Sequence, residues 1–443
     1  MIKRVLVLVA CIASSTQAQI GRVTGGQSQR ACETAGLQLP AGFCATTFAE
    51  SIDGARHIVV APNGDVFINT QASGPAARPG PGSRRRETGS IVALRDTDRD
   101  GRADSTRRFG VGGGTGIVLS GNSLYANAGN SIVRYRVPSG SLTAVGRPDT
   151  IVTGLPTTGH RSNNFVLVGR TLYVNIGSGT NACQERDRQA GSRGVNPCTE
   201  LETRAGIWEF DANRLRQRVE NGRRFATGIR NAVALTRNPF DGALYATVHG
   251  RDQLHDNWPS LYTTRENAEN PGEVMIRVDR GADYGWPYCY HDMTTRSLVL
   301  APEYGGDKRT VGQCASKTQG LMAFPAHWAP NGMLFYTSST FPSQYRGGAF
   351  VAFHGSWNRA PLEQAGFKVV YAPFRGNRPT GTYTTFADGF MRRPPGTTRV
   401  TAAPGVHRPV GLAESPDGAL YITDDIGGTI YKITFPRSRN PRR

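Results

Sequence analysis

Residues 410–424, VGLAESPDGALYITD, contain two apolar runs separated by a Pro-Asp-Gly turn sequence, with a tyrosine at the second position of the second run. Two short apolar runs around such a turn are typical of an antiparallel β-hairpin. The same phrase occurs at HIVVAPNGDVFINT (57–70), GIVLSGNSLYANA (116–128), NFVLVGRTLYVNI (164–176), AVALTRNPFDGALYATV (232–248) and AHWAPNGMLFYTS (326–338). We therefore predict six hairpins, with turns such as Asn63-Gly64, Asp241-Gly242, Asn331-Gly332 and Asp417-Gly418.

Several of these hairpins are followed by a third or fourth apolar segment, as in SIVALRD, SIVRYRV, GIWEFD, FKVVYAPF and TIYKITF. Six repeats of about four strands predict an all-β fold, a six-bladed β-propeller of four-stranded antiparallel blades. The last blade would be closed by strands from both chain ends, namely the segment before Ala61 and the final GTIYKITF. We expect residues 20–443 to form this single domain, with an Arg-rich tail at 437–443.

The composition agrees with this prediction. Of 443 residues, 54 are glycine and 27 proline, which disfavours a helical bundle, and 38% hydrophobic residues exclude a disordered chain. The formal net charge is +18, but the basic residues are scattered and no nucleic-acid-binding motif is present. We interpret the clusters Arg84–Arg86 and Arg437–Arg443 as a solvated loop and tail. Such a surface attracts acidic partners, including small acidic redox proteins.

The N-terminus has the features of a signal peptide over residues 1–19. Lys3 and Arg4 precede the apolar run Val5–Ala13, and Thr16-Gln17-Ala18 provides small residues for cleavage. A lipoprotein modified at Cys11 is the alternative. No other stretch is long and apolar enough for a membrane span. We therefore expect a periplasmic or secreted protein.

Export predicts disulfides among the six cysteines that remain after cleavage. Six cysteines permit about 15 pairings, and chain order favours the three local ones. These are Cys32–Cys44, Cys183–Cys198 and Cys289–Cys314.

Two segments interrupt the repeats. The interval between the fourth and fifth hairpins predicts an excursion over residues 249–325, and the Pro/Gly/Arg-rich stretch 71–88 predicts a flexible loop. A third segment, Asp96, Asp98, Asp100, Gly101 and Asp104, has the oxygen spacing of a calcium loop, but Arg107 replaces its last ligand. We leave calcium binding and an acidic turn with local hydrogen bonds both open there.

Polar residues precede the first strands of four predicted blades. His160 stands before the third, Arg230-Asn231 before the fourth, His327-Trp328 before the fifth and His407-Arg408 before the sixth. Because the first strands of a propeller line its axis, these side chains would converge at one mouth. Arginine binds carboxylates and histidine is a base near neutral pH, so the mouth predicts a site for an anionic or carbonyl-rich ligand.

Several motifs together resemble the soluble sugar dehydrogenases that depend on pyrroloquinoline quinone (PQQ), nearest the sorbosone and pyranose dehydrogenase branch. The motifs are a GLP followed by His160, the pair Arg230-Asn231, DYGWPYC (283–289), FHGSWNR (353–359) and HRPVGLAESPDGALYITDD (407–425). The likeness spans about residues 37–434. It implies that PQQ lies over the propeller axis, that a calcium ion bridges it to the protein, and that an aldose or sugar aldehyde is oxidised.

The resemblance also implies roles for single residues. His160 matches the general base that removes the sugar hydroxyl proton while hydride passes to the quinone. Arg230 matches the residue that polarises the quinone carbonyl, and Asn231 its neighbour at the quinone edge. Arg408 matches a cofactor-carboxylate arginine.

For the metal, the resemblance implies main-chain oxygens of Gly250 and Arg251, with Asp252 beside them, as calcium ligands. Glu273 and Asp283 fall where the family carries a second calcium.

The sequence departs from the glucose-oxidising members of this family. Gly159 replaces an acidic residue before the base, and the segment Pro325–Trp328 replaces a Trp and a Thr, which leaves His327 and Trp328 as candidates. The expected cofactor lysine is absent, so His354 and Arg359 are candidates in its place. These departures put glucose as the substrate in doubt.

Two other functions compete with the dehydrogenase. One is a calcium-dependent lactonase or esterase and the other a non-catalytic propeller that binds glycans or proteins. The electron acceptor of a dehydrogenase would be external, a quinone or a small acidic redox protein.

Overall fold

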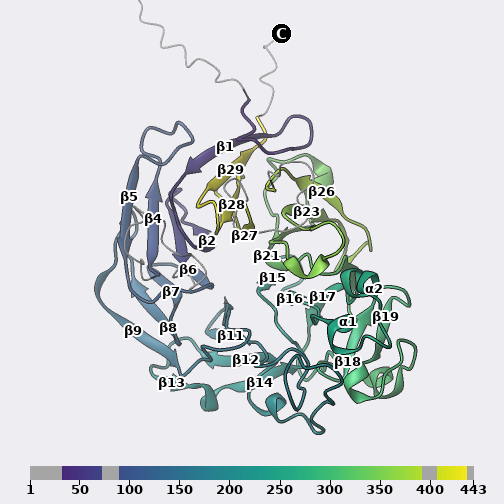
Figure 1. The fold of residues 1–443 in the computed structure, drawn as a ribbon. Coiled ribbons are helices and arrows are strands. Elements are labelled where there is room, and N and C mark those ends of the chain that lie inside the picture. The colour runs from purple at the N-terminus through teal and green to yellow at the C-terminus, as the bar shows by residue number, and fades with distance from the viewer. Residues whose placement is uncertain (1–31, 72–88, 392–406, 437–443) are drawn as a thin grey trace, which may run out of the picture. The chain divides into compact units, whose positions relative to one another are not determined.

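The computed structural model describes residues 32–71, 89–391 and 407–436 (Figure 1). The chain divides into two units, Met1–Cys32 and Glu33–Arg443, and every strand of the described residues belongs to the second. The predicted signal peptide (1–19), residues 72–88 of the predicted loop and the Arg-rich tail (437–443) lie outside the described residues.

Six antiparallel sheets form six blades, as predicted. Blade 1 is β2 (Ala55–Val60), β3 (Val66–Thr70), β4 (Ile91–Arg95) and β5 (Ser105–Phe109). Blade 2 is β6 (Ile117–Ser120), β7 (Ser123–Ala128), β8 (Ser131–Arg136) and β9 (Val145–Thr153), with β13 (Gln217–Arg218) added parallel to β9. Blade 3 is β10 (Phe165–Val168), β11 (Thr171–Ile176), β12 (Gly206–Asp211) and β14 (Arg223–Thr227).

The other three blades follow the same order. Blade 4 is β15 (Ala234–Arg237), β16 (Leu244–Val248), β17 (Glu273–Val278) and β20 (Met322–Phe324). Blade 5 is β21 (Pro330–Phe335), β22 (Ala349–Phe353), β23 (Lys368–Ala372) and β26 (Thr384–Ala387). Blade 6 is β27 (Pro409–Glu414), β28 (Leu420–Asp424), β29 (Ile430–Thr434) and β1 (Cys44–Ala49). The pairing of β1 with β29 is the predicted closure by both chain ends.

The first strand of every blade is the inner one, and each inner strand contacts the inner strands of both neighbouring blades (Figure 1). The apolar core lies between the faces of adjacent blades. One cluster, for example, joins Phe350 of blade 5 to Ile422 and Tyr431 of blade 6. Burial of these faces is the main contribution to holding the blades together.

Five of the six predicted hairpins are present. The prediction of a hairpin at residues 326–338 is wrong. Asn331 and Gly332 do not form a turn but lie within β21, whose partner β22 begins only at Ala349. A Cβ atom at Gly332 would lie 2.0 Å from the carbonyl oxygen of Val410 in blade 6. The glycine is therefore required for close approach of two inner strands, not for a turn.

A polar side chain on the second strand of most blades ties neighbouring inner strands together. In blade 2 the Asn127 oxygen accepts from Gly116 N at 2.6 Å, and its Nδ2 donates to the Asn163 carbonyl of blade 3 at 3.0 Å. The equivalent residues Asn69, Asn175 and Thr423 make similar bonds. The Asn or Thr that follows Tyr-x or Phe-x in the phrases of blades 1, 2, 3 and 6 thus links neighbouring inner strands.

The excursion predicted at 249–325 is divided in two by β17. Helices α1 (Leu254–Asn257) and α2 (Thr264–Glu269) precede β17. The hairpin β18 (Cys289–Asp292) and β19 (Ser297–Leu300) and the 3-10 turns Pro302–Tyr304 and Gly312–Ser316 follow it. A further excursion, 177–205, separates β11 from β12 and contains the 3-10 turn Thr199–Glu202.

Smaller elements complete the fold. They are the 3-10 turns Val219–Asn221, Ser343–Tyr345 and Trp357–Arg359 and the hairpin of β24 (Phe374–Arg375) and β25 (Arg378–Pro379).

Disulfides close both large excursions. Cys183–Cys198 and Cys289–Cys314 are bonded, as predicted, and Cys32 and Cys44 are also disulfide-bonded. Within the described ranges, no helix has the length and apolar character that crossing a membrane would require.

Candidate active site

The predicted base and the predicted carbonyl-polarising arginine meet at Ser178, just after β11. The Ser178 N–H donates to the Arg230 carbonyl oxygen at 2.8 Å, and the His160 N–H donates to the Ser178 carbonyl oxygen at 2.9 Å. His160 precedes β10 and Arg230 precedes β15, so neighbouring blade entries are joined. The main chains of these two entries are therefore linked through Ser178, and the convergence of the four entries at one mouth stays a prediction.

The imidazole of His160 is held through one ring nitrogen. Nδ1 lies 2.8 Å from the Ser178 hydroxyl oxygen and 3.1 Å from the Ser178 carbonyl oxygen. Burial, and after it the positive charge of Arg230, hold the pKa of His160 well below its ordinary value. His160 is therefore neutral at pH 7, and its second ring nitrogen, which has no hydrogen-bond partner among the described residues, is available as a base.

The Arg230 guanidinium is buried and has four acceptors. It donates to the Asn181 carbonyl oxygen (3.1 Å), the Asn181 side-chain oxygen (2.9 Å), the Gly250 carbonyl oxygen (2.7 Å) and an oxygen of Asp252 (3.0 Å). Planar guanidinium groups held by several acceptors at once keep one orientation. Arg230 is thus a fixed cation beside His160.

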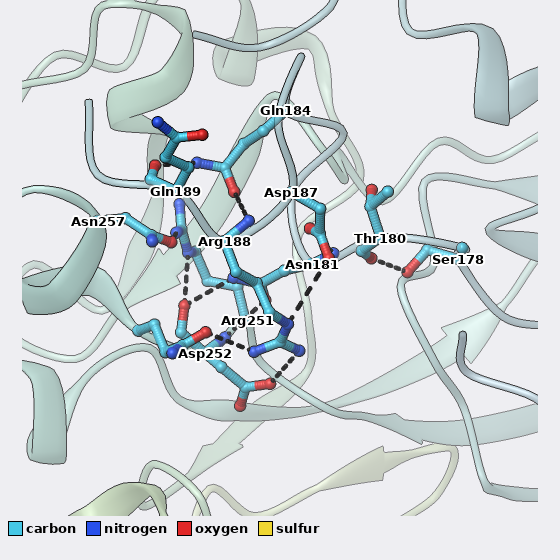
Figure 2. Close-up of polar contacts among 12 residues, drawn as sticks. Ser178, Thr180, Asn181, Gln184, Asp187, Arg188, Gln189, Arg251, Asp252 and Asn257 are labelled. Atoms are coloured by element: carbon cyan, nitrogen blue, oxygen red, sulfur yellow. Dashed lines mark hydrogen bonds and ion pairs between the residues drawn. The ribbon is translucent and has the colours of Figure 1, made fainter. Parts of the chain in front are cut away.

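Asp252 is the anion that balances this cation. Its carboxylate also accepts from Arg188 at 3.0 Å and from the Asn358 side chain (Figure 2 shows Arg188 and Asp252). Burial opposes ionisation of Asp252, but Arg230, His327 and Arg188 together keep the pKa of Asp252 far below its usual value. We call Arg230, Asn181, Asp252, Arg188 and Asn358 the Arg230 cluster.

The predicted calcium segment lies against this cluster. The Gly250 carbonyl oxygen accepts from Arg230, and Gly250 N donates to buried Glu273 at 3.0 Å. Glu273 also accepts from Ala329 N at 3.2 Å, and burial raises the pKa of Glu273 to about 8. Glu273 therefore fixes the Gly250 main chain in this structure.

The side chains of two other residues in the predicted metal sites, Arg251 and Asp283, are paired within the protein. The side chain of Arg251 forms a buried ion pair with Glu303 and donates to Asn257 at 3.1 Å. The Asp283 carboxylate pairs with Lys317 at 2.6 Å.

The acidic loop between β4 and β5 has a different character. Among the described residues, Asp96, Asp98 and Asp104 are the only group of three or more side chains whose ligand atoms could share a metal. The same loop makes local hydrogen bonds, such as Gly101 N to Asp96 at 2.9 Å. Both interpretations of this loop therefore remain predictions, and the loop is separate from the blade entries.

A second cluster of charges surrounds Arg408, ahead of β27. His354 Nε2 donates to an oxygen of Asp425 at 2.9 Å, and Arg56 donates to the other at 2.7 Å. Among the described residues, the Arg408 guanidinium makes a single hydrogen bond, 3.4 Å long, to His354 Nδ1, and it lies 5.3 Å from the centre of the Phe367 ring. We call Arg408, His354, Asp425 and Arg56 the Arg408 cluster.

Among the described residues, Arg408 and Arg56 each keep guanidinium donors that make no hydrogen bond to the protein. Burial lowers the pKa of Arg408, and the negative charges of Asp425 and Asp424 oppose this effect. The buried Nε of Arg56 also has no hydrogen-bond partner. Such a pair of cations suits a ligand that carries carboxylates.

The side chains of the remaining predicted site residues make contacts mainly with other parts of the protein. Asn231 accepts from the Ser162 hydroxyl at 3.3 Å, and His327 Nε2 donates to the Asn267 carbonyl oxygen at 2.7 Å. Trp328 packs edge-on against Phe353 with ring centres 5.2 Å apart. Arg359 donates to the carbonyl oxygens of Ala268 and Ala326. The structure does not join these side chains by hydrogen bonds to His160, Arg230 or Arg408.

Sequence reasoning missed several residues of the site. Arg56 stands just before the apolar run of the first blade, and the same blade-entry rule could have found it. Ser178, Asn181 and Arg188 lie in the excursion 177–205, for which the only sequence signal is the spacing of Cys183 and Cys198. Asn358 lies within the quoted motif FHGSWNR.

Comparisons with known proteins place this geometry in context. A family model described as TrAA12-like matches residues 37–435. The pyrroloquinoline quinone-dependent pyranose dehydrogenase of Coprinopsis cinerea is 26% identical over 392 residues, which cover 78% of this chain and 47% of that protein. An uncharacterized protein of Borreliella burgdorferi is 27% identical over 219 residues, 48% of each chain. The chain spans about half the length of the curated relatives it matches.

Solved structures agree on the fold. The PQQ domain of the Coprinopsis cinerea pyranose dehydrogenase superposes with a TM-score of 0.69 at 20% identity, over 90% of this chain and 97% of that one. A calcium structure of a Trichoderma reesei enzyme of carbohydrate-active family AA12 gives 0.69 at 19%, over 91% and 98%. The soluble aldose sugar dehydrogenase of Escherichia coli gives 0.57 at 16%, over 89% and 100%. At these identities the likeness establishes the architecture alone.

Proposed function

The chain belongs to the TrAA12-like family, and on that premise we propose that it is a PQQ-dependent dehydrogenase that oxidises an aldose or a sugar aldehyde. The pyranose dehydrogenase among its relatives supports this proposal. We further propose that calcium is required and that the protein is exported. The disulfides that close its excursions support an oxidising compartment.

The observation that carries the proposal is a neutral buried base together with arginines whose donors are used in two different ways. His160 and Arg230 meet at Ser178, whereas Arg408 and Arg56 keep guanidinium donors that make no hydrogen bond among the described residues. PQQ is a planar quinone with several carboxylates, and this donor set fits such a group. Arg408 and Arg56, with His354 between them, would hold its carboxylates.

Calcium fits the main chain better than the side chains. Carbonyl oxygens are ligands that calcium accepts, and those of Gly250 and Arg251 are the candidates, of which that of Gly250 also accepts a hydrogen bond from Arg230. The Asp252 carboxylate is engaged by Arg230, Arg188 and Asn358, so we do not assign it as a ligand in this state. We assign no calcium role to Asp283, because it is paired with Lys317.

Bound PQQ would supply a hydride acceptor for the carbon that bears the substrate hydroxyl, which is the anomeric carbon of an aldose or the carbonyl carbon of an aldehyde hydrate. The protein contributes the other half of the chemistry. His160 removes the hydroxyl proton, and it is competent at pH 7 because it is neutral there. Arg230 would supply a fixed positive charge to the quinone carbonyl oxygen, on which negative charge develops. The strongly positive chain supports an external, acidic electron acceptor.

The test begins with purified mature protein, calcium and PQQ. We expect stoichiometric quinone binding in a spectral titration, followed by dye reduction that depends on aldoses or sugar aldehydes. His160→Ala should still bind quinone but lose about 10²–10⁴-fold in turnover, the usual contribution of a general base. Because binding is retained, the variant controls for folding. No quinone binding at saturating calcium would overturn the proposal and make lactone hydrolysis or glycan binding the next assay.

A further inference from the structure

We propose that Ser178 is the positioning residue that fixes His160 in one tautomer, with the proton on Nδ1 and the lone pair on Nε2. This inference rests on the proposed function, since it says which nitrogen of the base receives the substrate proton. It also explains how the base is oriented although Gly159 stands where the glucose-oxidising enzymes have an acidic residue.

The tautomer follows from the two acceptors around Nδ1. The Ser178 carbonyl oxygen, 3.1 Å away, has no hydrogen to give, so the nitrogen must donate to it. The Ser178 hydroxyl, 2.8 Å from Nδ1, donates its only hydrogen to the Thr180 carbonyl oxygen at 2.7 Å (Figure 2). It therefore accepts from Nδ1 as well. A neutral imidazole carries one N–H, which leaves Nε2 unprotonated.

Ser178 is itself held by a clamp of two charged residues. Glu200 accepts from Gly179 N at 2.6 Å and from Thr180 through both its N–H and its hydroxyl. Arg204 donates to the Ser178 carbonyl oxygen at 3.2 Å and to the Gly177 carbonyl oxygen at 2.8 Å. Both residues follow Cys198 in the excursion 177–205. The serine therefore cannot turn away from the imidazole without breaking several hydrogen bonds.

The same clamp reaches the loop that carries the base. Arg204 also donates to the Thr158 carbonyl oxygen at 2.8 Å. Between Thr158 and His160, Gly159 has a φ of +66°, and a Cβ atom there would lie 2.6 Å from the Gly179 carbonyl oxygen. An acidic side chain at Gly159 is excluded by this contact. A neutral hydroxyl on the neighbouring segment takes over the orientation.

A serine orients the ring without the negative charge that a carboxylate would add. The charged groups that act on His160 are Arg230 and His249, which disfavour the imidazolium, and Asp252, which favours it. Burial disfavours the imidazolium most. A carboxylate at position 178 would therefore raise the pKa of His160 and move the acidic limb of the rate profile to higher pH.

The first experiment reads the tautomer without any cofactor. Nitrogen-15 NMR of the imidazoles in quinone-free protein should show His160 as the Nδ1–H tautomer in the wild type, with assignment by His160→Asn. Ser178→Ala removes the closer of the two acceptors of Nδ1 but keeps the main-chain carbonyl oxygen, so it should give a mixture of the two tautomers. Ser178→Thr, which keeps the hydroxyl, should restore the wild-type signals. Ser178→Cys, whose thiol is a weak acceptor, provides a second disrupting variant if the alanine variant does not fold.

The second experiment uses quinone-loaded protein. Ser178→Ala should lower kcat/KM about tenfold, because part of the general-base contribution is lost, with quinone affinity unchanged. Ser178→Asp should shift the acidic limb of kcat/KM to higher pH.

Unchanged His160 signals in folded Ser178→Ala or Ser178→Cys would overturn the inference. If no variant and no wild-type protein oxidises sugars, the proposed function fails, but the NMR result still decides whether Ser178 sets the tautomer.

Discussion

Two arginines at blade entries have the same charge and nearly opposite surroundings. Arg230 is 4% exposed and has four hydrogen-bond acceptors, one of them the anion Asp252. Arg408 is also desolvated, but among the described residues its guanidinium has one long hydrogen bond, to a neutral histidine. Asp425, the anion that acts most strongly on Arg408, is hydrogen-bonded to Arg56 and His354.

The difference separates two uses of a buried cation. In the Arg230 cluster the protein has already satisfied the charge, so this cluster is rigid and contributes to stability before any ligand binds. In the Arg408 cluster the charge is incompletely satisfied, so a ligand carboxylate gains more by binding there. Desolvated groups that lack partners cost free energy until a ligand supplies them.

The largest expected effect is on stability and tests whether the Arg230 cluster contributes to folding. Arg230→Ala leaves Asp252 buried with one of its two arginine partners removed. Breaking a buried ion pair in this way costs about 3–5 kcal/mol. We expect the free energy of unfolding of quinone-free protein to fall by about 3 kcal/mol in urea denaturation. Arg265→Ala, at an exposed pair on α2, is the matched control and should change it by less than about 0.5 kcal/mol.

Arg230→Ala should also lower kcat by about 10²–10³-fold, the usual loss when a fixed electrostatic donor is deleted. A stable, inactive Arg230→Ala would show that Asp252 does not depend on this arginine, and the contrast between the clusters would fail.

Arg408→Ala should have the opposite balance of effects, with little change in stability and a clear loss of quinone affinity. Since the protein uses this guanidinium little, the free energy of unfolding should change by less than about 1 kcal/mol. The affinity for quinone should instead fall about 30-fold, which corresponds to about 2 kcal/mol for a lost charge-assisted hydrogen bond. Spectral titration and urea denaturation of the same sample measure both quantities. Equal losses of stability in the Arg230 and Arg408 variants would contradict the comparison.

The propeller could be predicted from sequence because its signal is repeated. Alternating strands and turn glycines recur six times, and the blade-entry rule then places His160, Arg230 and Arg408 at one end of the inner strands. The turn prediction was wrong at Asn331-Gly332. The same pair, Asn-Gly, forms a turn at residues 63–64 but lies inside β21 here. Only the neighbouring strand, through the Val410 carbonyl oxygen, explains that glycine.

The environment of the site could not be predicted in the same way. Ser178, Arg188 and Asn358 reach His160 or Asp252 from irregular segments, which have no periodic pattern. Their contacts depend on tertiary packing between blades 3, 4 and 5. Sequence could therefore indicate which cations converge but not which of them the protein itself neutralises.

The pH dependence of stability tests the anion of the Arg408 cluster. Although burial opposes it, His354 and then Arg56 hold the pKa of Asp425 well below the value near 3.9 of an unfolded chain. A depressed carboxyl pKa gives stability that is present above about pH 4 and is lost as the pH falls further.

Asp425→Asn removes this contribution. It should lower the free energy of unfolding by about 1–2 kcal/mol at pH 7, and the difference from wild type should shrink at pH 3. Urea denaturation at both pH values measures it. A difference that is constant or grows toward acid would show that Asp425 is not stabilised as an anion.

The smallest expected effect on stability is at Arg188, the exposed member of the Arg230 cluster. Arg188 also pairs with Asp252, but its side chain is 34% exposed, so solvent screens the pair. Arg188→Ala should therefore lower the free energy of unfolding by only about 0.5 kcal/mol, because Arg230 and Asn358 still hold the carboxylate. Urea denaturation beside Arg230→Ala measures the contrast. If both arginines proved equally costly to remove, net charge at Asp252 rather than the buried geometry of Arg230 would be what stabilises this cluster.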